Sequence, residues 1–350
     1  MKTKKIKILC IFIGVAILAA LVGVYLIFNS SLFSKDKKSK DSNEGGNKDK
    51  TVEKIKIVDM DSKTRPYAVM INNISVARPL QSGLDKAYIV YEMIVEGGIT
   101  RYLALFKDVE VDRIGPIRSA RHYYLDYALE NDAIYVHHGQ SPQAQNDFGN
   151  LHVDRISVAE GKTGWRDKSL NVSSEHTLFS STDKLANGIG SKRTTLNSDK
   201  LLLDYSTKAI DLSSIAGAIP ANKVSIRYSN STTSSYEYDP ESQSYNRFVN
   251  GKAHNDYVTK EQLKFKNIIT YQVKNTTLND GENKGRQDLH NVGSGKGYYI
   301  TNGYAVPITW EKSSRSAKTV YKLEDGTTLK VNDGNTFIQI QPEGQTLTIE

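Results

Sequence analysis

Charged side chains that could act as acids, bases or anion ligands are concentrated between residues 84 and 139, in sequence that otherwise resembles buried strand and helix. The stretch V-Y-E-M-I-V-E-G-G-I-T-R, residues 90–101, holds Glu92, Glu96 and Arg101. Glycan-cleaving enzymes use two carboxylates as acid and base. Four strand residues span about 13 Å, which exceeds the ~5–9.5 Å that separates such a pair. Glu92 and Glu96 therefore do not form that pair in a straight strand, and Asp167 from a later loop is the candidate partner of either one.

These two glutamates lie in a predicted β-hairpin. Two apolar runs rich in β-forming residues, 88–96 and 99–106, flank Gly97-Gly98, which suits a two-residue turn with positive φ. Such a turn places Glu92 opposite Leu103, so that Glu92, Glu96 and Arg101 share one face of the sheet. The three side chains then form either part of a ligand site or an ion-pair ladder that fixes the hairpin.

The stretch I-G-P-I-R-S-A-R, residues 114–121, predicts an anion-binding helix start. Ser119 is the expected N-cap of a helix that runs to about residue 130, because apolar residues recur there with helical spacing. The free N–H groups of a helix start favour an anion, and arginine forks suit carboxylate and phosphate. We therefore expect Arg101, Arg118, Ser119 and Arg121 to bind ligand, unless the arginines pair with nearby acidic residues.

A short predicted strand, residues 133–138, ends in His137 and His138. With the strand at 99–106 and the helix between, it predicts a βαβ unit with parallel strands and a right-handed crossover, whose ligands gather at the strand C-termini. His137 is a candidate proton carrier and His138 a candidate ligand-binding residue. Two adjacent strand residues cannot hold one metal, and no recognised ligand spacing is present, so we predict no metal and no other cofactor.

The N-terminal region predicts a membrane anchor. Residues 8–28 form an uncharged apolar run that is long enough to cross a bilayer, preceded by four lysines. No small-residue cleavage site follows, so we expect an uncleaved single-pass helix with its N-terminus in the cytoplasm. Residues 29–56 are polar and predict a disordered tether. The rest of the chain is expected outside the cell.

The remaining chain predicts an α/β (α+β) protein. Residues 57–212 are expected to form a mixed-sheet α/β domain with the βαβ unit, and residues 213–350 a mainly antiparallel β domain. The second assignment rests on hairpin signals at Asn250-Gly251, Asn302-Gly303 and Asp325-Gly326.

Charge and cysteine content exclude several classes of function. Of the net charge of +7, the leader lysines contribute +4 and residues 29–56 contribute +3, which leaves zero for the folded part. A neutral folded part argues against nucleic acid as a partner. The single cysteine, Cys10, lies in the leader, so no disulfide and no catalytic cysteine is expected outside the membrane.

The stretches quoted above, together with Y-V-H-H-G (135–139) and G-S-G-K-G-Y-Y-I-T-N-G (293–303), resemble the YerB-like family of bacterial envelope proteins. The resemblance runs from about residue 65 to residue 342. It implies an exported, two-domain protein, typically a lipoprotein, and it implies no reaction because the family has no known function. This chain departs from the lipoprotein pattern because Cys10 lacks the small residue expected just before a lipid-modified cysteine.

Two functions follow as expectations. The first is binding, with cleavage left open, of an anionic cell-wall glycan or peptidoglycan fragment in a crevice lined by the residues named above. If the protein were an enzyme, it would be a carboxylate-dependent glycan hydrolase or lyase. The second is a non-catalytic scaffold that contacts other envelope proteins, with the charged residues as structural pairs.

Overall fold

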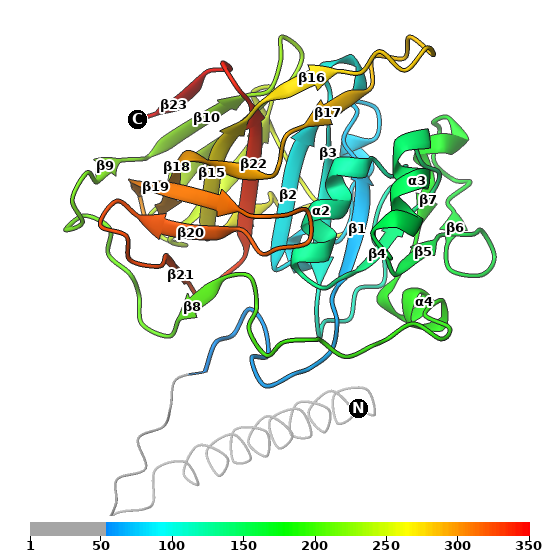
Figure 1. Ribbon diagram of the computed structural model, residues 1–350, viewed down its shortest axis with the longest axis horizontal. Coiled ribbons are helices and arrows are strands. Elements are labelled where there is room, and N and C mark those ends of the chain that lie inside the picture. Colours follow the sequence, from blue (N-terminus) through cyan, green and yellow to red (C-terminus); the bar gives the residue numbers. More distant parts are fainter. Residues whose placement is uncertain (1–53) are drawn as a thin grey trace, which may run out of the picture. The chain divides into compact units, whose positions relative to one another are not determined.

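A mixed β-sheet of eleven strands runs through the protein, as the computed structural model shows (Figure 1). The structure describes residues 54–350, which belong to one compact unit. The predicted anchor and nearly all of the predicted tether lie outside the described residues. No helix within residues 54–350 is long and apolar enough to cross a membrane.

Ten strands of the sheet lie in the order β20-β19-β18-β15-β22-β2-β3-β1-β4-β5, and β9 pairs with β19. Their bounds are β1 (Tyr67–Asn72), β2 (Ile89–Ile94), β3 (Thr100–Phe106), β4 (Ile134–His137), β5 (Arg155–Ser157), β9 (Ile219–Pro220), β15 (Asn267–Val273), β18 (Gly293–Thr301), β19 (Tyr304–Lys312), β20 (Val320–Leu323) and β22 (Thr336–Pro342). At the centre of the sheet, β22 is buried along its whole length and pairs in parallel with both β15 and β2. Strands from both predicted domains therefore form one sheet.

A second sheet has six strands and is antiparallel throughout. It consists of β10 (Lys223–Arg227), β11 (Thr233–Asp239), β12 (Ser244–Val249), β13 (Lys252–Ala253), β14 (Lys264–Phe265) and β23 (Leu347–Ile349). Burial alternates strictly along β12, as expected for a strand with one face on a core. Three two-stranded sheets complete the strands: β16 (Asn275–Thr277) with β17 (Gln287–Leu289), β8 (Asp204–Ser206) with β21 (Lys330–Asn332), and β6 (Trp165–Arg166) with β7 (Leu178–Phe179).

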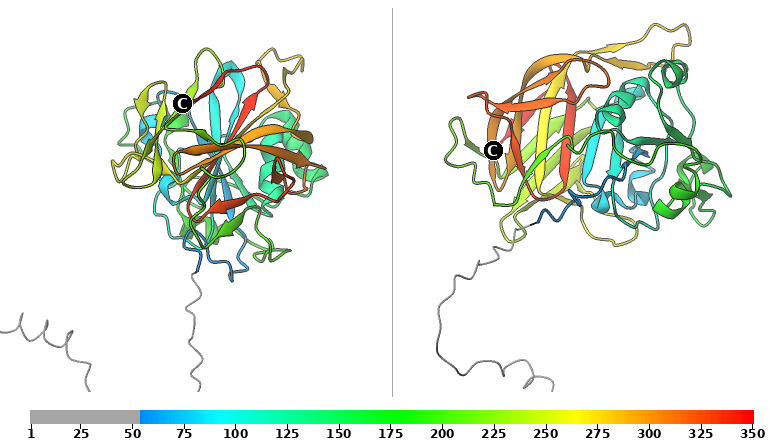
Figure 2. Two further views of the ribbon diagram at one scale, coloured as in Figure 1. Left: turned by 90° about the vertical axis from the view of Figure 1, so that its left-hand side faces the viewer. Right: turned by 60° about the horizontal axis from the view of Figure 1, so that its bottom comes forward.

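Helices are few among the described residues and cover the β1–β4 part of the large sheet (Figures 1 and 2). They are α2 (His122–Glu130), α3 (Pro142–Asn150) and α4 (Thr182–Asn187), with short 3-10 turns at Arg78–Leu80, Leu84–Lys86, Glu96–Gly98 and Ser174–His176. Tyrosines anchor α2 to the sheet: the Tyr124 hydroxyl donates to the carbonyl of Met93 or Arg101, both at 2.8 Å, and the Tyr127 ring lies 4.9 Å from that of Tyr91.

The predicted βαβ unit is wrong in its strand arrangement, although its strands and helix exist. β1 pairs antiparallel with β3 and parallel with β4, so it lies between them and makes β3 antiparallel to β4. The sequence of residues 99–138 does not show that β1, a strand from earlier in the chain, lies between β3 and β4. The parallel pairs are instead β1 with β4 and β4 with β5, and their C-terminal ends meet at one edge of the sheet.

Candidate functional site

The hairpin β2–β3 has a register one residue away from the predicted one. The turn contains three residues, Glu96, Gly97 and Gly98, because the N–H of Val95 donates to the carbonyl of Ile99 at 2.8 Å. Both glycines have positive φ, 70° and 72°, as predicted. Glu92 now lies opposite Tyr102, and Arg101 lies opposite Met93. A shift of one residue exchanges the faces of a strand, so Glu92 and Arg101 lie on opposite sides of the sheet, and the predicted ladder of Glu92, Arg101 and Glu96 is wrong.

Glu92 is buried between the two sheets and paired with an arginine from β12. The side chains of Glu92 and Arg247 are both 0% exposed, and Nη2 of Arg247 lies 2.7 Å from Oε2 of Glu92. Ser234 donates to the same oxygen at 2.8 Å, and Thr100 donates to Oε1 at 2.6 Å. Every carboxylate oxygen thus has internal donors, and the structure does not bring Glu92 into the predicted crevice.

Arg247 itself is held by aromatic and polar neighbours. Its Nε donates to Nδ1 of His254 at 3.1 Å, Nη1 donates to the Tyr236 hydroxyl, and the guanidinium lies 4.1 Å from the centre of the Phe337 ring. These contacts join the six-stranded sheet to the large one. The pair therefore has the geometry of a structural link, since ionised side chains are rarely buried unless they are paired and hydrogen-bonded.

Glu96 lies on the turn and forms a cluster with two of the predicted arginines. Arg121 binds it with both arms, Nε to Oε1 at 2.6 Å and Nη2 to Oε2 at 2.9 Å, and Nη2 of Arg101 lies 3.8 Å from Oε2. Burial alone would raise the pKa of Glu96, but the hydrogen bonds and charge of Arg121, with the charge of Arg101, lower it below its usual value. Burial, together with the charge of Arg121, lowers the pKa of Arg101 to about 10.

Ser119 is not the helix N-cap that the sequence predicts. Helix α2 begins at His122, with Arg121 at the N-cap position and no side-chain cap. The carbonyl of Ser119 instead accepts from Arg101 at 2.6 Å. Arg118 lies outside the helix and donates to a carboxylate oxygen of Glu175 at 2.6 Å. Both Arg118 and Arg121 thus have an acidic partner, which is the alternative that the sequence left open.

His137 and His138 point in different directions, as expected for adjacent strand residues. His137 is 0% exposed, and its Nδ1 lies 2.8 Å from the carbonyl of Gly139. Burial lowers the pKa of His137 to about 4, against the opposing effect of that hydrogen bond. Nε2 of His137 has no hydrogen-bond partner among the described residues. His138 bonds through Nδ1 to the carbonyl of Val158 at 2.8 Å, and its Nε2 lies 3.3 Å from Nη2 of Arg166.

Asp167 follows β6, a two-residue strand where the sequence predicted a loop. Its Oδ1 accepts from the backbone and hydroxyl of Ser169 at 3.1 and 2.6 Å, and its Oδ2 lies 2.9 Å from Nη1 of Arg113. The hydrogen bonds from Ser169, then the Arg113 contact, lower the pKa of Asp167. Asp167 is therefore paired with arginine in the same way as Glu92 and Glu96. No group of three or more His, Cys, Asp or Glu side chains among residues 54–350 is placed to hold a metal.

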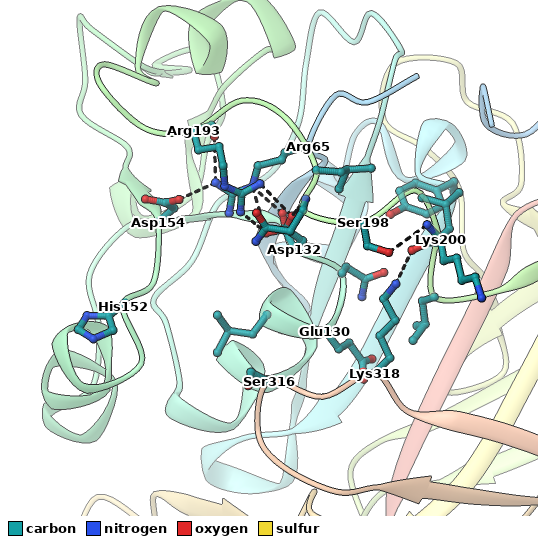
Figure 3. Close-up of a pocket in the computed structure, with 17 residues that line it drawn as sticks. Arg65, Glu130, Asp132, His152, Asp154, Arg193, Ser198, Lys200, Ser316 and Lys318 are labelled. Carbon is teal, nitrogen blue, oxygen red and sulfur yellow. Dashed lines mark hydrogen bonds and ion pairs between the residues drawn. The ribbon is translucent and has the colours of Figure 1, made fainter. Parts of the chain in front are cut away.

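Sequence reasoning missed two cavities that combine charge with apolar surface. The first, here called the lysine cavity, has a volume of about 350 Å³ and lies beside Arg65, Asp132, Arg193, Lys200 and Lys318 (Figure 3). The second, here called the tyrosine cavity, has a volume of about 360 Å³. It is lined by residues 75, 78 and 79 and by residues 252–257 and 260. Each is assembled from segments more than 100 residues apart, and none of them carries a motif.

Comparison with known proteins identifies the family. The family models described as "Protein of unknown function (DUF3048)" match here, the N-terminal domain over residues 55–195 and the C-terminal domain over residues 224–338. A protein of Bacillus subtilis (strain 168) named "Putative lipoprotein YerB" is 30% identical over 291 residues, which cover 81% of this chain and 82% of that protein. The crystal structure of YerB from Bacillus subtilis superimposes with a TM-score of 0.67 at 28% identity, covering 81% of this chain and 94% of that one. The resemblance noted in the sequence is thereby confirmed, and the chain belongs to the YerB family of proteins with DUF3048 N-terminal and C-terminal domains.

Proposed function

We propose that this protein is a membrane-anchored envelope protein that binds an anionic cell-wall glycan outside the cell and does not cleave it. The location is supported by the relation to a protein named as a lipoprotein and by the apolar run at residues 8–28. The single observation that carries the binding proposal is the tyrosine cavity, whose lining contains three cationic side chains and the ring of Tyr257.

The cations of the tyrosine cavity have no acidic partners. Within the described residues, Arg78, Lys252 and Lys260 have no carboxylate oxygen within 4.0 Å. Asn73 holds the guanidinium of Arg78 in place, accepting from Nε and Nη2 at 3.0 Å each. Nζ of Lys260 lies 4.0 Å from the centre of the Tyr257 ring. The positive charge here is therefore available to a ligand, unlike that of Arg118 and Arg121.

The acidic residue of this cavity does not neutralise the cations. Asp256 is 2% exposed, and its carboxylate accepts from the backbone N–H groups of Gly83 and Val258, both at 2.7 Å. It thereby fixes the loop that carries Tyr257 against the N-terminal half of the chain. A cavity that combines an aromatic side chain with ammonium groups suits a sugar that carries carboxylate or phosphate, because the cations bind its charge and the aromatic surface contacts its apolar part.

The candidate carboxylates favour binding without cleavage. Glu92, Glu96 and Asp167 each bind an arginine, at 2.7, 2.6 and 2.9 Å. A general acid in a glycosidase needs a raised pKa, whereas the pKa values of Glu96 and Asp167 are lowered. The arrangement therefore favours a binding protein over a hydrolase.

Sedimentation with purified cell walls tests the proposal. The full chain in uncharged detergent should sediment with the walls, and Lys252→Gln with Lys260→Gln should weaken this binding by about tenfold for each ammonium group that is removed. The matched control, Lys208→Gln with Lys322→Gln, removes the same charge from exposed positions and should bind as the wild type does.

Three results would contradict the proposal. Equal weakening in both double variants would mean that net charge alone drives sedimentation. A wild-type chain that stays in solution would favour the scaffold, with other envelope proteins as its partners. Soluble glycan fragments, detected by mass spectrometry of the supernatant, would show that the protein is an enzyme after all.

A further inference from the structure

We propose that the lysine cavity binds the phosphate group of an amphiphilic molecule, with an anionic membrane lipid as its first candidate source. The proposal rests on the envelope location proposed above and concerns a different cavity. Most of its lining comes from three segments: the end of α2 with Asn131 and Asp132, residues 193–202, and the loop between β19 and β20 that contains Lys318 (Figure 3).

Two arginines at the cavity are already neutralised. Nη1 of Arg193 lies 2.9 Å from Oδ2 of Asp132, and Nη1 of Arg65 lies 2.5 Å from Oδ2 of Asp154. Arg65 also donates to three backbone carbonyls, which include that of Asp132 at 2.7 Å. Two positive charges thus face two negative ones, and this side of the cavity is a rigid wall rather than an anion site.

The buried carboxylate near the other side is also occupied. Oε2 of Glu130 accepts from Nζ of Lys312 at 2.8 Å, and from the hydroxyl and backbone N–H of Thr319 at 2.6 and 3.0 Å. Its second oxygen accepts from the hydroxyl of Tyr91 at 2.7 Å. Glu130 therefore has no oxygen left to pair with Lys318.

Lys200 and Lys318 consequently remain without an acidic partner. Among the described residues, neither has a carboxylate oxygen within 4.0 Å, and Nζ of Lys318 donates to the backbone carbonyl of Lys200. Figure 3 shows the two residues next to each other at one side of the cavity. In the described part of the chain, both lysines line the cavity without a carboxylate to offset their charge, and a phosphate oxygen accepts from ammonium groups readily.

The remaining lining indicates an apolar part of the ligand. Beside polar residues, the wall contains one aromatic and four apolar side chains: Tyr88, Leu129, Leu196, Leu201 and Leu202. A free inorganic phosphate would leave this surface in contact with water, whereas glycerol and the first carbons of an acyl chain would cover it. A volume of about 350 Å³ suits a headgroup with a few carbons and not a whole lipid.

The position of the cavity agrees with a membrane lipid. The wall segment 194–196 is hydrogen-bonded to residues 63–65, where the N–H of Leu196 donates to the carbonyl of Lys63 at 2.7 Å and that of Arg65 donates to Thr194 at 2.8 Å. The polypeptide that comes from the predicted anchor thus passes along this wall before it enters β1. The cavity therefore lies beside residues 63–65, the segment that leads into β1.

Thermal unfolding of the full chain in uncharged detergent tests the inference with two probes. Dihexanoyl phosphatidylglycerol should raise the unfolding midpoint, and sn-glycerol 3-phosphate distinguishes the source. If only the lipid stabilises the protein, the ligand is a lipid headgroup; if both act equally, the apolar part adds nothing, and the inference of an amphiphilic ligand is overturned. Dihexanoyl phosphatidylcholine, which carries no net charge, should have a much smaller effect.

Lys200→Gln with Lys318→Gln should reduce the affinity for phosphatidylglycerol by about tenfold for each ammonium group that is removed. Both side chains reach solvent, so the variant is expected to fold. The control Lys208→Gln with Lys322→Gln should keep the wild-type affinity. The inference is overturned if neither phosphatidylglycerol nor sn-glycerol 3-phosphate shifts the unfolding midpoint. It is also overturned if Lys200→Gln with Lys318→Gln binds phosphatidylglycerol as tightly as the control variant does. Neither result bears on sedimentation with cell walls, which depends on the other cavity.

Discussion

Glu92→Gln should destabilise the protein without abolishing any surface function, because the Glu92–Arg247 pair links the two sheets. The substitution keeps the size of the side chain but leaves a 0% exposed guanidinium without its counter-charge. Removal of one partner from a buried ion pair costs about 3–5 kcal/mol, a large part of the ~5–15 kcal/mol by which a domain is stable. With an unfolding entropy of about 2.1 cal/mol/K per residue, roughly 300 residues give a fall of about 5–8 °C in the unfolding midpoint.

The assay is a double-mutant cycle measured by chemical or thermal unfolding. Arg247→Met alone should also destabilise, because Glu92 then lacks its cation. The double variant should be less destabilised than the sum of the two single variants, since the coupling energy of a close buried pair exceeds about 1 kcal/mol. Glu96→Gln is the matched comparison: its carboxylate is 20% exposed and bound on the surface, so we expect a decrease in stability nearer 1 kcal/mol.

Additive single effects, or an unfolding midpoint for Glu92→Gln within about 1 °C of the wild-type value, would refute this reasoning. Either result would mean that Glu92 is hydrated or uncharged in the native protein. A Glu92→Gln variant that unfolds as the wild type does but binds cell walls less well would restore the sequence-based view of Glu92 as a site residue.

Three further predictions concern the histidine strand, the helix starts and a close strand contact. Because burial lowers the pKa of His137 from 6.5 to about 4, His137 contributes stability that is complete above pH 6.5 and is lost as the pH falls towards 4; this loss amounts to ~3 kcal/mol. In His137→Phe, the unfolding midpoint should therefore depend less on pH between 6.5 and 4. The same pH dependence as in the wild type would contradict the lowered pKa of His137. Ser141 caps α3 by accepting from the N–H of Ala144 at 3.2 Å, so Ser141→Ala should cost about 1 kcal/mol, whereas Ser119→Ala should cost less than about half of that. Equal effects in urea unfolding would show that Ser119 is a cap after all. Gly297→Ala should destabilise by about 1–3 kcal/mol, because an added Cβ would lie 2.3 Å from the carbonyl oxygen of Thr270 on β15; a circular dichroism melt that matches the wild type would contradict this close approach.

Much of the local structure could be predicted from the sequence. Apolar runs located β2, β3 and β4 to within a few residues, and Asn250-Gly251 and Asn302-Gly303 were confirmed as hairpin turns with positive φ. Such signals are local, because they depend on side-chain period and on residues that tolerate unusual backbone angles.

The site could not be predicted to the same degree, because it depends on whether the turn between β2 and β3 contains two residues or three. Gly97-Gly98 correctly predicts positive φ, yet the sequence does not state that Glu96 belongs to the turn. That difference moves Glu92 from the face of Arg101 to the opposite face. The partner that then binds Glu92 is Arg247, 155 residues later, and a contact at that separation leaves no periodic signal.

The cavities were missed for a related physical reason. In the tyrosine cavity, Arg78 comes from a 3-10 turn and Lys252 from β13, and neither is unusual in its own segment. Unpaired charge is a property of the folded arrangement, because only the fold determines which arginines and lysines have an acid within reach. Composition indicates a neutral folded part, which conceals local excesses of positive charge.

The position of β22 has a consequence for biosynthesis. β22 inserts between β2 and β15, and Thr336, the start of β22, comes 242 positions after Ile94, the end of β2. A nascent chain therefore cannot complete the centre of the large sheet until nearly all of it has been synthesised, and such long-range pairing forms slowly. If the protein is exported as we propose, it would remain unfolded, and so able to thread a translocation channel, for most of its passage. Truncation before Thr336 would leave β2 without its β22 partner and as an open edge, exposing it to aggregation and to envelope proteases.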